Sequence, residues 1–165
     1  MEELSRGSAR FAEELRRLGV ASAVQEMPES TRTAAGAAAA LNCDVAQIVK
    51  SLIFRAVVAD EAVLVLASGA DRVDESRLAQ VIGEPVEQAT GKFVRARTGY
   101  AIGGVPPVGH TRPLATYIDE HLLGHALVWA AAGTPRAVFC IGAADLIRIT
   151  SAKVVAVAAP VPPTD

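Results

Sequence analysis

Lys50 is a residue whose type and surroundings could support chemistry. The chain has 165 residues, and of its 16 basic side chains three are lysines and the rest are arginines. A lysine flanked by Val49 and Leu52 could hold a phosphate or carbonyl oxygen with its compact ammonium group, because apolar neighbours reduce the competition from water. The alternative is a lysine that complements the dipole at the C-terminal end of a helix.

Residues 99–110, which we call the glycine loop, are the second candidate, with four glycines and two prolines in twelve positions. Glycines let a backbone approach a ligand closely and prolines stiffen it. The amide N–H groups of such a loop become fixed donors that can polarise a carbonyl. The loop lacks the Lys-Ser/Thr pair of a Walker loop and any GxGxxG pattern, which argues against these two nucleotide-binding motifs. The alternative is an ordinary surface loop.

A basic stretch surrounds the glycine loop. The formal net charge of the chain is −2, which argues against a protein that coats nucleic acids, but residues 92–112 contain no acid. Their basic side chains are Lys92, Arg95, Arg97 and Arg112. This clustering indicates a phosphate-bearing ligand near the loop, with a solvated basic face as the alternative.

Other reactive groups form no recognisable site in the sequence. His121 and His125 have the i, i+4 spacing of metal ligands, but the Glu of an HExxH motif and a third ligand are missing, so we expect no metal. Cys43 and Cys140 lack CxxC spacing and are expected to be buried free thiols. Without a nucleophile elbow at Ser68 or a cofactor fingerprint, any reaction must depend on donors, positioning and the substrate's own groups.

The pattern of apolar residues predicts a mixed α/β domain. Helices are expected from a cap at Ser8 to Gly19, over 33–41, over 71–82, from a cap at Thr90 to Gly99, and over 143–149. Strands are expected over 52–58, 62–67, 114–118, 126–130, 136–141 and 154–158, the first two as a hairpin. A short helix capped by Asp44 would place Lys50 at its junction with the first strand. The irregular order of helices and strands favours a mixed sheet with helices packed on it over a Rossmann fold.

A single domain accounts for the whole pattern. Residues 1–159 are expected to form it, with 160–165 as a loose tail. No stretch approaches the roughly 20 apolar residues of a membrane span, and the N-terminus lacks the apolar core of a signal peptide. A soluble, cytoplasmic protein is therefore expected.

Three segments resemble the YbaK/prolyl-tRNA synthetase-associated domain family, the bacterial trans-editing deacylases. They are AQIVKSLIF at 46–54, TGYAIGGVPPVG at 98–109 and DLIRITSAKVV at 145–155. The resemblance implies an α/β (α+β) fold with a mixed, barrel-like β-sheet and surrounding helices. It also implies hydrolysis, in trans, of the ester between a wrong amino acid and the 3′ adenosine of tRNA.

The resemblance implies roles for individual residues. Lys50 matches the lysine that contacts the ester or the terminal nucleotide, and Gly103, Gly104, Val105 and Pro106 match the loop whose backbone amides orient the aminoacyl carbonyl. In that family the ribose hydroxyl next to the ester assists, which agrees with the missing protein nucleophile. The further positions expected to contact the substrate are Thr31, Thr33, Ser51, Pro107, His110, Gly133 and Thr134. For His110, a capping or structural role is the alternative.

The implied partner is the acceptor end of aminoacyl-tRNA, with an aminoacyl-tRNA synthetase as a second candidate, and no cofactor, metal or membrane is expected. The branch of the family that removes cysteine carries an Asp after the glycine-rich turn, where this chain continues Ala137-Val138-Phe139. This departure argues against cysteine as the edited amino acid. Two rival functions share the same features: a module that binds aminoacyl-tRNA or a synthetase without cleavage, and a hydrolase of other small acyl esters.

Overall fold

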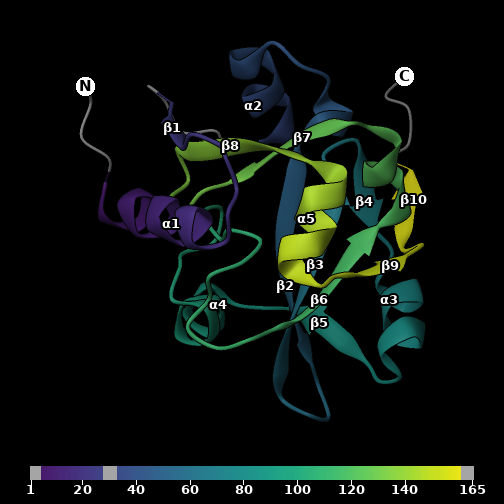
Figure 1. Cartoon of the computed structure of the whole chain (residues 1–165). Helices are drawn as coiled ribbons and strands as arrows, with labels where there is room; N and C mark the ends of the chain where they lie inside the picture. The colour runs from purple at the N-terminus through teal and green to yellow at the C-terminus, as the bar shows by residue number, and fades with distance from the viewer. Residues whose placement is uncertain (1–4, 28–32, 161–165) are drawn as a thin grey trace.

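The structure is a computed structural model that describes residues 5–27 and 33–160 (Figure 1). Its helices are α1 (Arg6–Arg17), α2 (Ala34–Leu41), α3 (Glu75–Ile82), α4 (Gly91–Thr98) and α5 (Ala143–Thr150), with the short 3-10 helices η1 (Val45–Gln47) and η2 (Glu120–Gly124). Its strands are β1 (Gln25–Glu26), β2 (Val49–Ala56), β3 (Glu61–Ser68), β4 (Asp71–Val73), β5 (Val86–Gln88), β6 (Ala115–Asp119), β7 (Leu127–Ala131), β8 (Ala137–Gly142), β9 (Lys153–Val155) and β10 (Ala158–Pro160). None of the described helices has the length and apolar character needed to cross a membrane.

The described strands form three sheets. The largest has the order β5-β2-β3-β6-β9, in which β2 and β3 form an antiparallel hairpin and β3-β6 and β6-β9 are parallel. A second, antiparallel sheet has the order β1-β8-β7, and β4 pairs with β10. An isolated bridge between Ile48 and Trp129 connects the first two sheets. The predicted mixed α/β fold is confirmed; the described strands do not close into a barrel, and the barrel-like detail stays a prediction.

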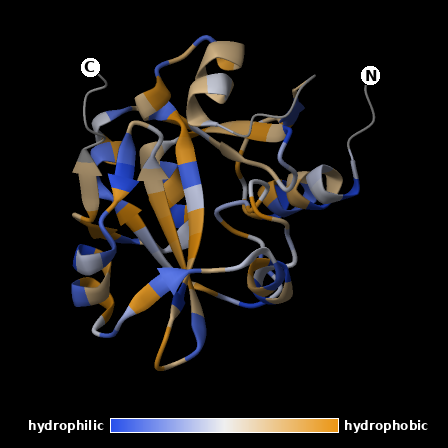
Figure 2. Cartoon of the chain, turned by 180° about the vertical axis from the view of Figure 1, so that it is seen from behind, coloured by the Kyte–Doolittle hydropathy of each residue, from blue (hydrophilic) through white to orange (hydrophobic). Residues whose placement is uncertain are grey.

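The strand β3 lies at the centre of the core. Its residues 62–68 are all buried, and successive side chains point to opposite faces of the sheet. Leu64 shares one apolar cluster with Phe11 of α1, whereas Val65 shares another with Leu78 of α3. The two faces of the largest sheet therefore pack in different apolar clusters, and its central strands are largely hydrophobic in Figure 2.

Local signals predicted several helix ends correctly. Thr33 and Thr90 cap α2 and α4 through their side-chain oxygens. Asn42 and Gly99 end these helices in the left-handed conformation, with φ of 54° and 83°. The predicted hairpin of β2 and β3 is also present.

Other element boundaries differ from the prediction. Ser5 rather than Ser8 caps α1, because the Oγ of Ser5 accepts a hydrogen bond from the amide of Ser8, which is itself buried. Residues 71–73 are not helical: they form β4 by pairing with β10 far along the chain, and α3 begins only after its cap, Asp74. The strand predicted over 154–158 is two short strands, β9 and β10. Pro160, expected to begin the tail, belongs to β10, and residues 161–165 lie outside the described part.

The position at which β2 begins decides whether Lys50 lies in a helix or in a strand. β2 begins at Val49 and η1 ends at Gln47, so Lys50 and Ser51 lie within a strand rather than at a helix end. Complementing a helix dipole therefore does not explain Lys50. At the other end β2 stops at Ala56, before the residues expected to finish the strand.

The two cysteines are less buried than expected. Cys43 and Cys140 are free, as predicted, but both are half-buried. Burial raises the pKa of both thiols. Neither cysteine has the lowered pKa of an activated thiol nucleophile.

Candidate functional site

A cavity of about 170 Å³ lies between β2, α4 and the glycine loop. It is lined by residues 51–54 of β2, by Val94 of α4 and by Ile102, Gly103 and Val105 of the loop. An apolar cavity of about 150 Å³ is large enough to bind benzene. The cavity therefore fits a small side chain.

The cavity forms where β2 loses its neighbour. β5 pairs only with residues 54–56 of β2, and the last hydrogen bond on this edge runs from Ala89 N to Ile53 O, at 3.2 Å. Backbone groups alternate between the two edges of a strand, so the N–H and C=O of Ser51 point to the same side as those of Ile53. Among the described residues no strand pairs with this part of the edge, and β2 presents open backbone to the cavity.

The first part of the glycine loop is anchored to α1. Arg10 donates from Nε to the hydroxyl of Tyr100 and from Nη2 to Gly99 O, both at 3.1 Å. The guanidinium of Arg10 also lies over the Tyr100 ring, 4.2 Å from its centroid. Tyr100 and Val105 are buried in the main core cluster, so the backbone between them has little freedom to move.

The middle of the loop docks on the turn between β7 and β8. A Cβ added at Gly104 would lie 2.7 Å from the Cα of Thr134, so only glycine fits without displacing backbone. Gly133 donates from its N–H to Gly104 O at 3.1 Å, and it also packs against the backbone of Gly7 in α1. Gly133 and Thr134, which we predicted to contact substrate, do not line the cavity; they support the loop that does.

His110 supports the same loop from its other end. Its Nε2 lies 2.7 Å from Pro106 O, and because a carbonyl oxygen only accepts, Nε2 carries the proton. Burial lowers the pKa of His110, and this hydrogen bond offsets the shift only in part, so the ring is neutral near pH 7. His110 and Pro107 line a separate pocket and not the cavity. Of the two roles predicted for His110, these contacts favour the structural one.

Three polar groups around the cavity have no partner in the described part of the chain. The N–H groups of Val105, which is buried, and of Gly103, which is exposed, donate to no acceptor there, and the buried hydroxyl of Ser51 has no hydrogen bond. Buried polar groups in folded proteins are nearly always bonded. Unpaired groups gathered at one cavity indicate a ligand site. Two amide donors and a hydroxyl could bind a carbonyl oxygen and a neighbouring polar group.

Lys50 lies close to this cavity but does not line it. Its Nζ donates to the backbone oxygen of Asp71. Burial lowers the pKa of Lys50, while the charge of Asp71 opposes the shift. The side chain shares a face of β2 with Leu52, which lines the cavity two positions or about 6.6 Å further along the strand. In this structure the ammonium group and the loop amides therefore do not meet.

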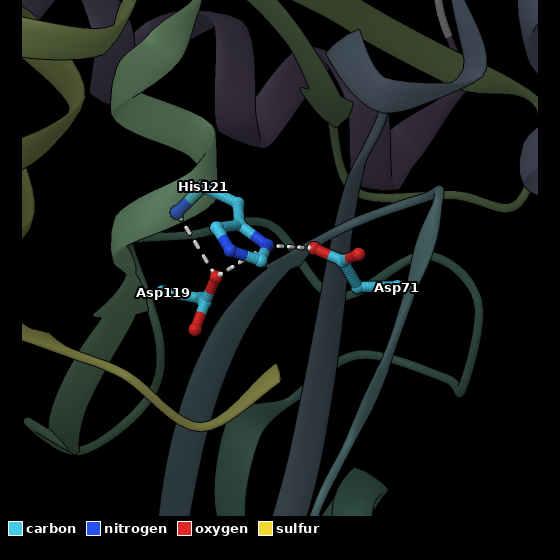
Figure 3. A group of neighbouring side chains, drawn as sticks. All are labelled: Asp71, Asp119 and His121. Atoms are coloured by element: carbon cyan, nitrogen blue, oxygen red, sulfur yellow. Dashed lines mark hydrogen bonds and ion pairs between the residues drawn. The ribbon is translucent and has the colours of Figure 1, made fainter. Parts of the chain in front are cut away.

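A polar cluster of Asp71, Asp119 and His121 lies near the C-terminal ends of β3 and β6 (Figure 3). Nδ1 of His121 lies 2.6 Å from Asp71 Oδ2, and this hydrogen bond raises the pKa of His121. Asp119 is fully buried, and its Oδ1 accepts hydrogen bonds from the N–H groups of residues 157 and 158, at 2.9 and 3.1 Å. The ligand atoms of the cluster lie within 4.8 Å of one another, but these internal bonds account for the arrangement and we assign no metal. His125 is not part of the cluster.

Comparisons with known proteins identify the family to which this fold belongs. Residues 28–149 match the model of the aminoacyl-tRNA editing domain. The chain belongs to this family. A solved structure of a candidate trans-editing enzyme for prolyl-tRNA synthetase is 46% identical, with a TM-score of 0.90 over 95% of this chain and 99% of that one. The hypothetical protein APE2540 is 30% identical, with a TM-score of 0.84 over 91% and 99% of the two chains.

A curated relative is more distant. The uncharacterized protein YwhH of Bacillus subtilis (strain 168) is 28% identical over 131 residues, which cover 79% of this chain and 83% of that protein. Together with the family match and the 46% identical structure, these findings confirm the predicted relationship to the YbaK-like trans-editing proteins.

Thr33, another predicted contact residue of this editing domain, does not line the cavity. Thr33 Oγ1 accepts a hydrogen bond from Gly36 N at 3.0 Å in its role as the cap of α2, and its side chain is exposed. Thr31 lies outside the described residues. Of the predicted contact residues other than the loop, Ser51 is the one that the structure brings to the cavity.

The basic stretch is divided between two environments. Arg97 donates to the carboxylate and the backbone oxygen of Asp60. Lys92, Arg95 and Arg112 are exposed and form no ion pair within the described ranges. The cations available to a phosphate ligand are therefore three rather than the predicted four.

The sequence reasoning missed the apolar walls of the cavity and the buried carboxylates. Val94 and Ile102 carry no local signal that separates a cavity wall from ordinary core or surface. Asp71 and Asp119 lie at the ends of segments rich in buried residues. Acids at such positions are a signal that could have been noticed.

Proposed function

We propose that this editing domain hydrolyses the ester of mischarged aminoacyl-tRNA in trans, in the cytoplasm. The observation that carries the proposal is the group of unpaired donors, the amides of Gly103 and Val105, beside the unpaired hydroxyl of Ser51 at one small cavity. A cavity of about 170 Å³ suits an aminoacyl side chain and leaves the terminal adenosine outside. Membership of the aminoacyl-tRNA editing family supports this assignment of the substrate.

The loop amides stabilise the charge that develops during hydrolysis. Water attacks the carbonyl carbon of the ester, and the carbonyl oxygen gains negative charge within reach of the N–H groups of Gly103 and Val105. Gly104 and Pro106 fix these donors through their contacts with residues 133–134 and His110. Donors that are already oriented stabilise such an oxyanion without further reorganisation.

The substrate supplies the group that a protein nucleophile would otherwise provide. The ribose hydroxyl next to the ester positions the attacking water and relays its proton. A new C–O bond forms between the water oxygen and the acyl carbon, the ester C–O bond breaks, and the released ribose oxygen takes the proton. The products are the free amino acid and tRNA.

Lys50 contacts the ester or the terminal nucleotide in this proposal. Its side chain must rotate away from Asp71 O to do so. Lys50 is half-buried, so a phosphate or carbonyl oxygen would meet less competition from water for the ammonium group.

The acceptor end of tRNA would lie across α4 and the end of the glycine loop. Lys92, Arg95 and Arg112 are exposed there and have no ion-pair partner among the residues described. Phosphate contacts by such side chains weaken as salt rises. The similarity to a candidate trans-editing enzyme for prolyl-tRNA synthetase supports a prolyl-tRNA synthetase as the source of the mischarged tRNA.

The direct test is to incubate the purified protein with a panel of mischarged tRNAs and with matched aminoacyl-nucleosides. Release of the amino acid from at least one tRNA, well above the buffer rate, is expected. Tight binding of aminoacyl-tRNA without release would favour a binding module instead. Equal hydrolysis of nucleoside esters and full tRNA would favour a general acyl esterase.

Lys50→Ala should reduce kcat/KM strongly while leaving the fold intact, because the side chain is half-buried and makes one hydrogen bond to a backbone oxygen. Lys153→Ala is a matched control, since Lys153 is exposed on β9, three strands away from β2 in the sheet. Full activity of the Lys50 variant would contradict the role proposed for this lysine.

A further inference from the structure

The hydroxyl of Ser51 is an unusual group in this fold. This hydroxyl is buried. Within the described residues it is the single buried side-chain oxygen or nitrogen atom without a hydrogen-bond partner. Ser51 lies on the open edge of β2 and lines the cavity. The position of this hydroxyl cannot be explained by a structural hydrogen bond.

The other buried hydroxyls of the described residues are bonded. Ser68 Oγ donates to Ala46 O at 2.9 Å, and Thr98 Oγ1 donates to Val94 O at 2.7 Å. Ser8 Oγ lies 3.0 Å from Ser5 Oγ. Since an unsatisfied buried hydroxyl destabilises a fold, the exception at Ser51 points to a partner that arrives with the ligand.

The chemistry of the cavity restricts what that partner can be. The N–H groups of Gly103 and Val105 only donate and suit a carbonyl oxygen, so they cannot accept a hydrogen bond from an amino group. No carboxylate lines the cavity. The polar side chains that line it are those of Ser51 and Gln88. A hydroxyl has two acceptor lone pairs and can accept a hydrogen bond from an amine.

We propose that Ser51 Oγ accepts a hydrogen bond from the α-amino group of the aminoacyl ester and makes that group a specificity determinant. This inference rests on the proposed function and adds to it the part of the substrate that Ser51 recognises. With the carbonyl oxygen at the loop amides and the α-amine at Ser51, the acyl group is held at two points across the cavity. An acyl ester without an α-amine makes only the first contact and leaves Ser51 unpaired.

Two variants of equal shape test the proposal. Ser51→Thr keeps a hydroxyl, whereas Ser51→Val replaces it with a methyl group of similar size. Each is compared with the wild type on two substrates: the aminoacyl-tRNA of the panel that is hydrolysed fastest, and the same tRNA carrying the des-amino acyl group. We expect Ser51→Val to lose on the order of 10- to 100-fold in kcat/KM on the aminoacyl ester relative to Ser51→Thr, and little on the des-amino ester.

The stability of the variants separates this role from a structural one. Ser51→Ala removes an unsatisfied hydroxyl and should leave Tm unchanged or raise it, while reducing activity on the aminoacyl ester. Ser68→Ala is the matched control on the neighbouring strand, because it removes a hydroxyl that is bonded. It should lower Tm and change the hydrolysis of both esters by the same factor.

The outcomes distinguish this inference from the function on which it rests. If the wild type hydrolyses the aminoacyl ester but Ser51→Val and Ser51→Thr lose activity equally on both esters, the role of Ser51 is overturned and the proposed function stands. If the wild type hydrolyses no member of the panel, both are overturned. A loss confined to the aminoacyl ester supports the contact between Ser51 and the α-amine.

Discussion

Replacing Gly104 by alanine tests whether the exact position of the glycine loop matters for deacylation. The added Cβ would lie 2.7 Å from Thr134 Cα and 2.8 Å from Thr134 C, whereas ordinary contacts begin at 3.4 Å. Both neighbours are backbone atoms, so the loop must move by about 0.7 Å. Such a shift would lengthen the hydrogen bond from Gly133 N to Gly104 O and displace the amides of Gly103 and Val105.

The size of the effect follows from this displacement. A misplacement of about 1 Å in a catalytic group can cost about 100-fold in rate, so we expect kcat/KM for deacylation to fall by about 10- to 100-fold. Overpacking of this kind also destabilises by about 1–3 kcal/mol. Single-turnover deacylation and thermal unfolding measure the two effects separately.

Gly124→Ala is the control, since a Cβ there would meet no atom within 4 Å and Gly124 has no positive φ. It should leave both activity and Tm close to the wild type. Wild-type kcat/KM for Gly104→Ala, with the protein fully folded, would refute the idea that the loop amides must be held in place.

Two histidines should give opposite responses to pH. Burial lowers the pKa of His110, so its protonation destabilises the fold as the pH falls below the ordinary value of 6.5, and His110→Ala should remove this acid sensitivity. His110→Ala should also lower stability at pH 7.5 by about 1–3 kcal/mol, because Pro106 O loses its donor; an unchanged Tm would contradict this. The hydrogen bond to Asp71 raises the pKa of His121, so its stabilisation is complete below 6.5 and is lost as the pH rises through the raised value. About half of the His121 side chain is exposed, so the loss of Tm should be small, and a His121→Gln variant that kept the same pH dependence would rule this histidine out as the source.

Features decided by neighbours in sequence could be predicted, and those decided by distant pairing could not. The caps of α2 and α4 depend on Thr33 and Thr90 and on the two or three residues that follow each of them. In contrast, residues 71–73 read as part of a helix because their pairing partner, β10, lies more than 80 residues away. Boundaries of this kind depend on tertiary contacts that override local propensity.

The candidate site shows the same division. The composition of the glycine loop was sufficient to single it out, and Ser51 lies where the motif at 46–54 placed it. The support of the loop by Gly133, Thr134 and His110 required the folded chain, because these residues look like ligand contacts in the sequence. The hydrogen bond of Lys50 to Asp71 O depends on β4, which the sequence did not reveal.

The unpaired polar groups at the cavity indicate what kind of substrate it binds. An unsatisfied buried polar group costs about 1–3 kcal/mol, and the hydroxyl of Ser51 is such a group. Beside it, within the described chain, the N–H groups of Val105, which is buried, and of Gly103, which is exposed, are unpaired, whereas the buried side chains of Asp119 and Thr98 are bonded. Among the described residues the other buried side-chain oxygen and nitrogen atoms are bonded, so the open hydroxyl and the two amides beside it indicate a ligand that bonds them together. That ligand must carry an oxygen acceptor next to a hydrogen-bond donor within a space of about 170 Å³, which is the arrangement of the carbonyl and α-amine in an aminoacyl ester.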